Sequence, residues 1–138
     1  MKLSLLMVPD RIDPALLRRH QSANIKIVQE RQSMKAVTEQ ADLIVSNGNH
    51  GTAAAAMLGG VPMLSFPLHQ EQQCCARRVA DSSLGATLPV QGGKAVAGLL
   101  ESMLASNAMR NTCKATAARY QGFNYQRSVQ QMVARQSR

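Results

Sequence analysis

The turn at residues 47–52, with the sequence Asn-Gly-Asn-His-Gly-Thr, has the composition of an anion-binding loop. It follows an apolar run at residues 43–45 and precedes an alanine-rich stretch, so a strand should lead through it into a helix. Backbone N–H groups are unpaired at a helix N-terminus, and the helix dipole makes that end positive. Gly48 and Gly51 carry no Cβ, which permits close approach of a ligand and positive φ angles. The turn predicts a phosphate site, although such glycines also occur in purely structural turns.

A second polar group, Glu71 and Gln72, follows a predicted strand that ends at Pro67. A carboxylate accepts hydrogen bonds from two hydroxyls, while an amide both donates and accepts, so the pair suits the hydroxyls of a sugar. A glutamate in the first turn of an ordinary helix would look the same, because the helix dipole favours it there. The sequence leaves both interpretations of this pair open.

The elements around these residues alternate between strands and helices. Strands are predicted at residues 3–8 and 25–28, and Asp13 and Pro14 should begin the helix between them. The alternation continues through residue 88, and its short connections imply parallel strands with right-handed crossovers. The predicted fold class is therefore α/β, a three-layer, Rossmann-like, doubly wound parallel sheet with extra C-terminal helices. Ligands of such sheets bind beyond the carboxyl ends of the strands, where residues 47–52 would lie.

Residues 24–88 resemble the donor-sugar-binding domain of nucleotide-sugar glycosyltransferases with the GT-B fold, whose pattern is roughly HGGxGTxxEAxxxGVPxxxxPxxxDQ. The residues that match are Gly48, Gly51, Thr52, Gly60, Val61, Pro62, Pro67 and Gln72, with Glu71 at the acidic position. The resemblance implies the C-terminal half of a GT-B enzyme that transfers a hexosyl group from a nucleoside-diphosphate sugar, with a uridine nucleotide favoured. It further implies that the turn at residues 47–52 holds the diphosphate and that Glu71 and Gln72 hold the sugar.

Several positions depart from the family pattern. Asn47 replaces the motif histidine, and it can donate a hydrogen bond to a diphosphate oxygen but cannot carry a positive charge. Asn49 replaces the second glycine, which is tolerable because asparagine adopts left-handed backbone angles more readily than most residues. Ala55 lacks the carboxylate that often holds the ribose in the family. His50 could supply the missing imidazole or be a turn histidine without a ligand, and Arg31 could stack on uracil or be a solvated loop charge.

A chain of 138 residues suffices for one domain, residues 1–138, but not for a two-domain GT-B enzyme. The resemblance implies a separate N-terminal domain that supplies the acceptor pocket and usually the catalytic base. A truncated reading frame, a subunit completed by a partner protein and a degenerate relative that only binds would each fit this sequence. In all three cases we expect little sugar transfer by the chain alone. The resemblance implies a nucleotide-sugar ligand, and we predict no metal or other cofactor.

The C-terminal region is basic, since the formal net charge is +8 and no acidic residue follows Glu101. The basic residues beyond it include Arg110, Lys114, Arg119, Arg127, Arg135 and Arg138. Asn124 should cap a last helix. Residues at helical spacing would form its apolar face: Tyr125, Val129, Met132 and Val133. The N-terminal acceptor domain or a second copy of the chain, in a homo-oligomer, is expected to cover that face.

This basic region raises a different class of function, an inactive or partner-dependent α/β binding module that acts through its basic C-terminal face. Aromatic residues make up only 3% of the chain, which leaves few stacking platforms for bases, so we predict no nucleic-acid partner. Peripheral contact with an anionic membrane fits the charge better. Binding of UDP would separate a donor domain from such a module.

The three cysteines, Cys74, Cys75 and Cys113, form no metal-binding pattern, and their odd number fits a reducing compartment. The sequence also contains no zinc-type His-Glu motif and no Ser-His-acid set. No apolar run approaches about eighteen residues, and the first residues are too short for a signal-peptide core. We therefore predict a cytoplasmic protein with no membrane-spanning segment and no bound metal.

Overall fold

The computed structural model describes residues 4–8, 13–20, 22–90 and 93–136. The chain divides into two compact units, Met1–Val37 and Thr38–Arg138. The first unit holds a two-stranded parallel sheet, and the second holds a three-stranded parallel sheet. The interpretation of residues 1–138 as a single domain stays a prediction.

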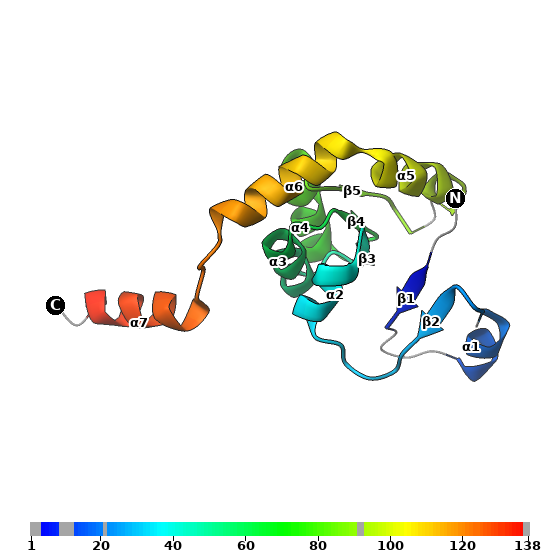
Figure 1. The fold of residues 1–138 in the computed structure, drawn as a ribbon, viewed down its shortest axis with the longest axis horizontal. Coiled ribbons are helices and arrows are strands. Elements are labelled where there is room, and N and C mark those ends of the chain that lie inside the picture. The colour runs from blue at the N-terminus through cyan, green and yellow to red at the C-terminus, as the bar shows by residue number, and fades with distance from the viewer. Residues whose placement is uncertain (1–3, 9–12, 21, 91–92, 137–138) are drawn as a thin grey trace. The chain divides into compact units, whose positions relative to one another are not determined.

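The first unit contains one strand-helix-strand motif and leads into a second helix (Figure 1). Its elements are β1 (Leu5–Met7), α1 (Pro14–His20), β2 (Ile25–Ile27) and the start of α2 (Met34–Gln40). The carboxylate of Asp13 accepts a 2.7 Å hydrogen bond from the N–H of Ala15, so it caps α1 as predicted. Both strands are shorter than the sequence predicts, and Leu3 lies outside the described residues.

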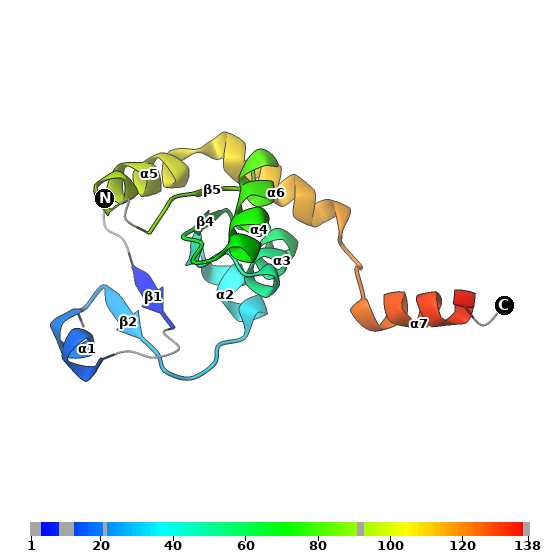
Figure 2. The same cartoon turned by 180° about the vertical axis from the view of Figure 1, so that it is seen from behind.

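The second unit repeats the strand-helix alternation. Its elements are β3 (Ile44–Ser46), α3 (His50–Gly59), β4 (Met63–Ser65), α4 (Gln70–Asp81), β5 (Gly85–Thr87), α5 (Gly93–Ala105), α6 (Asn107–Arg119) and α7 (Tyr125–Gln136). The strands run parallel in the order β3-β4-β5. Helices α3 and α4 lie side by side, and α6 packs on α3 (Figures 1 and 2). Parallel strands with helical crossovers and C-terminal helices confirm the predicted Rossmann-like α/β class.

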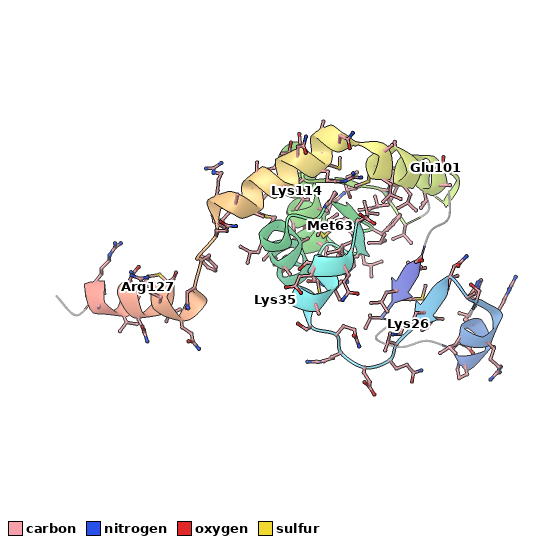
Figure 3. The ribbon with its side chains drawn as sticks, viewed as in Figure 1. Lys26, Lys35, Met63, Glu101, Lys114 and Arg127 are labelled. Carbon is pink, nitrogen blue, oxygen red and sulfur yellow. The ribbon has the colours of Figure 1, made fainter. Side chains whose placement is uncertain are left out.

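The core of the second unit is built around β4. Met63, Leu64 and Ser65 are all at most 1% exposed, as expected for a parallel strand with neighbours on both edges and helices above it. Figure 3 labels Met63 among the strands and helices of this unit. Helix α3 contributes Ala53 and Ala56 to the core, and their small side chains let the helix lie close to its neighbours α4 and α6. The alanine-rich sequence therefore both favours the helix and sets how closely it packs.

The C-terminus of α3 is held against α6. Gly60 ends α3 in the left-handed conformation, with φ at 70°. A Cβ at this position would lie 3.2 Å from the Cβ of Ala117 and 3.3 Å from the Cα of Lys114. Glycine therefore permits both the helix-ending turn and the close approach of α6.

Ser65 and Ser46 form a matched pair for a stability test. The Ser65 hydroxyl is fully buried and has no hydrogen-bond partner among the residues that the structure describes, whereas the Ser46 Oγ accepts a 3.0 Å hydrogen bond from the N–H of Gly48. We expect Ser65→Ala to leave the free energy of unfolding unchanged or to raise it by up to about 1 kcal/mol, because an unpaired buried hydroxyl is removed. Ser46→Ala should lower it by about 1 kcal/mol. Urea unfolding measures both, and an equal loss in the two variants would contradict the assignment.

The last helix begins as predicted, because the Asn124 side chain accepts a 3.0 Å hydrogen bond from the N–H of Arg127. Met132 and Val133 on its apolar face are both 59% exposed. Among the described residues, no helix combines the length and the apolar character needed to cross a bilayer.

The cysteines are unpaired thiols, with Cys74 exposed and both Cys75 and Cys113 buried. Burial raises the pKa of Cys75, which the Arg78 charge partly opposes, and burial alone raises the pKa of Cys113. These two thiols therefore stay protonated near neutral pH and are weak nucleophiles. No group of His, Cys, Asp and Glu side chains within the described part of the chain could hold a metal ion.

Candidate functional site

The loop between β3 and α3 is anchored at Gly48. This glycine has φ at 82°, a backbone conformation that other residues rarely adopt. A Cβ here would lie 3.3 Å from both the Cβ of Ala76 and the carbonyl oxygen of Gln72 on α4. The N–H of Gly48 donates to the Ser46 hydroxyl, a contact that the sequence analysis missed. Gly48 is therefore required by the close packing of the loop on α4, independently of any ligand.

Asn47 and Asn49 organise the remainder of the loop. The side-chain oxygen of Asn47 accepts hydrogen bonds from the backbone N–H of Asn49 at 3.3 Å and from its side-chain amide at 3.1 Å. Asn49 is the N-cap of α3, and its Oδ1 accepts a 2.8 Å hydrogen bond from the N–H of Thr52. Asn49 does not use the left-handed backbone angles that asparagine tolerates, because it is extended with φ at −67° and ψ at 152°. Asparagine at this position therefore supplies a side-chain cap that glycine cannot provide.

The cap at Asn49 can be tested directly. We expect Asn49→Ala to lower the free energy of unfolding by about 1 kcal/mol, because the N–H of Thr52 loses its acceptor. Asn49→Asp serves as the control, since a carboxylate also caps a helix and is favoured by its dipole. Urea unfolding of the three proteins measures the difference. An alanine variant as stable as the aspartate variant would contradict the capping role.

Two backbone donors at the start of α3 remain available to a ligand. The N–H groups of His50 and Gly51 have no acceptor within the described chain. The side-chain amide nitrogen of Asn47 and the hydroxyl of Thr52 likewise have no hydrogen-bond acceptor among the described residues. A Cβ at Gly51 would meet only the Oδ1 of Asn49, at 3.6 Å, so the space beside the first turn is open. The first turn of α3 therefore offers donors, a positive dipole end and room for an anion.

The structure brings His50 and Glu71 together from two different crossovers. The Nε2 of His50 lies 3.7 Å from the Oε1 of Glu71, and the side chains are 66% and 72% exposed. Such an exposed pair contributes little to stability. The position of the pair matters for ligand binding. Glu71 lies in the first turn of α4, and the N-termini of α3 and α4 follow adjacent strands. A ligand bound at the start of α3 would therefore have Glu71 as a neighbour.

The side chain of Gln72 is mostly buried, which limits its access to a ligand. It is 8% exposed, and its Oε1 accepts a 2.9 Å hydrogen bond from the N–H of Leu68. The bond fixes the turn before α4, whose N-cap residue, His69, makes no side-chain capping bond. The oxygen of Gln72 is thus committed to the protein, and only its Nε2 remains for a sugar hydroxyl. A glutamine three residues after an N-cap is a known helix-start signal, which the sequence analysis did not use.

Arg31 belongs to the first unit, in the segment between β2 and α2, and is exposed. The other candidate residues, 47–52 with Glu71 and Gln72, all belong to the second unit. Stacking of Arg31 on a nucleotide base therefore stays a prediction.

The sequence matches no protein-family model. It is 36% identical over 85 residues to the NDP-glycosyltransferase YjiC of Bacillus subtilis (strain 168), and the match covers 62% of this chain and 21% of that protein. The chain thus spans about a fifth of the length of this curated relative.

Solved glycosyltransferase structures share the fold. The glycotransferase of kitacinnamycin superposes with a TM-score of 0.75 at 19% identity, over 86% of this chain and 31% of that protein. LpCGTa in complex with UDP gives a TM-score of 0.74 at 23% identity, over 96% of this chain and 35% of that protein. VinC in complex with dTDP gives a TM-score of 0.75 at 17% identity, over 88% of this chain and 31% of that protein.

The parallel α/β fold of the chain is the fold of the glycosyltransferase structures that it matches. The chain is related to the nucleotide-sugar glycosyltransferases with the GT-B fold, which confirms the resemblance found at residues 24–88. It corresponds to about a third of the structures that it matches, in agreement with their C-terminal domain. The roles of individual residues in ligand binding stay predictions.

Proposed function

We propose that the chain binds a nucleoside-diphosphate sugar and forms the donor half of a site for hexosyl transfer. The diphosphate would accept hydrogen bonds from the N–H groups of His50 and Gly51, with further donation from the side chains of Asn47 and Thr52. Glu71 would accept hydrogen bonds from sugar hydroxyls, helped by the Nε2 of Gln72. In this proposal Gly48 does not contact the ligand through a side chain but sets the backbone conformation of the loop.

The observation that carries the proposal is the open first turn of α3. Its two unpaired N–H groups lie at the carboxyl end of a parallel strand, where ligands of α/β sheets bind. No acidic side chain belongs to the loop itself, and the Oε1 of Glu71 on α4 lies 3.7 Å from the Nε2 of His50. An anion at this turn therefore meets donors and a positive dipole end.

A pyrimidine nucleoside diphosphate is the favoured part of the donor. This choice is supported by the fold shared with LpCGTa, whose structure contains UDP, and with VinC, whose structure contains dTDP. Arg31 would stack on the base, because a planar guanidinium can lie on an aromatic ring. Without a carboxylate at Ala55, the ribose would be held less tightly than in the family pattern.

The donor half would promote transfer by holding the sugar in position and by stabilising the charge of the leaving diphosphate. Deprotonation of the acceptor would be left to an N-terminal acceptor domain or to a partner subunit. We therefore expect little sugar transfer by these 138 residues alone. A cytoplasmic location, with the basic C-terminal helices near an anionic membrane surface, belongs to the same proposal.

Calorimetric titration with UDP, uridine and pyrophosphate tests this function. We expect UDP and pyrophosphate to bind and uridine to bind much more weakly, because the proposed donors contact phosphate. Thr52→Ala should weaken UDP binding, since the hydroxyl is lost while the N–H that pairs with Asn49 is kept. No detectable binding of UDP at millimolar concentration would overturn the proposal and favour a binding module that acts through its basic C-terminal face.

A further inference from the structure

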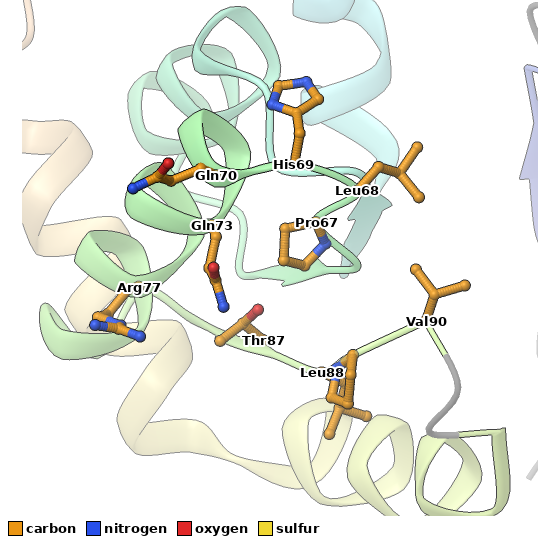
Figure 4. Close-up of a pocket in the computed structure, with 10 residues that line it drawn as sticks. Pro67, Leu68, His69, Gln70, Gln73, Arg77, Thr87, Leu88 and Val90 are labelled. Atoms are coloured by element: carbon orange, nitrogen blue, oxygen red, sulfur yellow. The ribbon is translucent and has the colours of Figure 1, made fainter.

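A groove on the second unit lies outside the proposed donor contacts. It is formed between the segment that joins β4 to α4 and the segment that follows β5 (Figure 4). Its volume is about 960 Å³, which lies within the range of small-molecule sites. None of the residues proposed to hold the diphosphate or the sugar lines it.

One end of the groove is apolar. Leu68 and Val90 are 70% and 54% exposed, and Pro67 and Leu88 continue the same lining. Figure 4 shows Leu68 and Val90 on the same side of Pro67. Large exposed side chains gathered in a concave surface favour a ligand that removes them from water.

The other end is polar and carries a positive charge. Gln70, Gln73 and Arg77 are spaced by three and four residues along α4, so they share one face of the helix. Thr87 faces them from the end of β5, and Figure 4 shows Gln73 and Thr87 directed toward each other. Amide and hydroxyl groups therefore surround the approach to the guanidinium.

Arg77 has no acidic partner within the described chain. It takes part in no ion pair or hydrogen bond there, and no Asp or Glu is found among the residues that line the groove. A guanidinium presents a planar set of donors that fits a carboxylate in a bidentate manner. An anionic group at the Arg77 end would therefore supply the missing counter-charge.

We propose that this groove binds a small molecule with an apolar body and one terminal carboxylate. The carboxylate pairs with Arg77 and accepts from Gln73, while the apolar body covers Leu68 and Val90. The proposal does not rest on the donor-site function, because the two sets of residues do not overlap.

Titration of the purified chain with 2-naphthoate and with the neutral 2-naphthalenemethanol, followed by saturation-transfer NMR, tests the groove. We expect the carboxylate to bind about tenfold more tightly than the alcohol, because it gains a charge-assisted hydrogen bond. Arg77→Gln should abolish that preference. Arg78→Gln is the matched control, since it removes the same charge one residue away on α4 but outside the groove lining.

A second variant tests whether the apolar end of the groove contacts the probes. Leu68→Ser should weaken both probes to a similar extent, because it removes apolar contact and leaves Arg77 in place. Equal affinities for the acid and the alcohol would overturn the proposal. So would an equal loss of naphthoate binding in Arg77→Gln and Arg78→Gln, because attraction by the net charge of +8 would then explain the preference.

Discussion

Replacement of Gly85 by alanine is expected to lower the free energy of unfolding by about 3 kcal/mol. A Cβ built at this first residue of β5 would overlap the carbonyl oxygen of Met63 and would lie 3.1 Å from a methyl group of Val79. The carbonyl belongs to the buried strand β4, so it cannot move away without disturbing the pairing of β4 with β5. Urea or thermal unfolding of the purified chain measures the loss.

Gly98→Ala is the control for this effect. Gly98 lies inside α5, and nothing lies within 4 Å of the position that its Cβ would occupy. Alanine should therefore leave the stability unchanged or raise it by up to about 1 kcal/mol, because it favours the helix. If Gly85→Ala were as stable as the natural chain, the close pairing of β5 with β4 would be wrong.

Gly51→Ala is expected to weaken UDP binding about tenfold, or about 1.4 kcal/mol, without loss of stability. The added methyl group would occupy the open space beside the N–H groups to which the diphosphate is proposed to bind. In the free protein it would meet only the Oδ1 of Asn49, at an ordinary contact distance of 3.6 Å. Calorimetry with UDP measures the affinity, and thermal unfolding measures the stability.

This substitution separates a ligand role from a structural role. Alanine has the higher helix propensity, so Gly51→Ala should not destabilise α3. If Gly51 had only a structural role in the turn, the substitution would leave the affinity for UDP unchanged. Gly98→Ala should keep the natural affinity, because it lies on α5 and far along the chain from the loop. An unchanged affinity in Gly51→Ala would contradict the placement of the diphosphate at the start of α3.

The sequence predicted the fold well because local patterns decide its elements. The alternation of short apolar runs with helical stretches predicted the parallel α/β class, and Asp13 and Asn124 marked the starts of two helices. The start of α3 was less predictable. The helix begins at His50, before the alanine-rich stretch, because Asn49 caps it with its side chain. Helix propensity alone places the boundary too late, since it does not include the cap.

The site was predictable in outline but not in detail. The turn at residues 47–52 does lie at a helix N-terminus, yet its own asparagine side chains take up part of its donors. Gln72 turned inward because the backbone before α4 offers it the N–H of Leu68, a contact set by the folded turn. The groove beside Arg77 joins side chains from two crossover segments, so no single stretch of sequence indicates it.

We propose that the first turn of α3 binds a diphosphate. An NMR titration of the ¹⁵N-labelled chain with UDP tests it most directly, because it follows the backbone N–H groups themselves. We expect saturable shifts of the His50 and Gly51 amide signals with UDP, and no comparable shifts with uridine. If UDP leaves both signals unmoved, or shifts only signals elsewhere in the chain, the diphosphate does not bind at this turn.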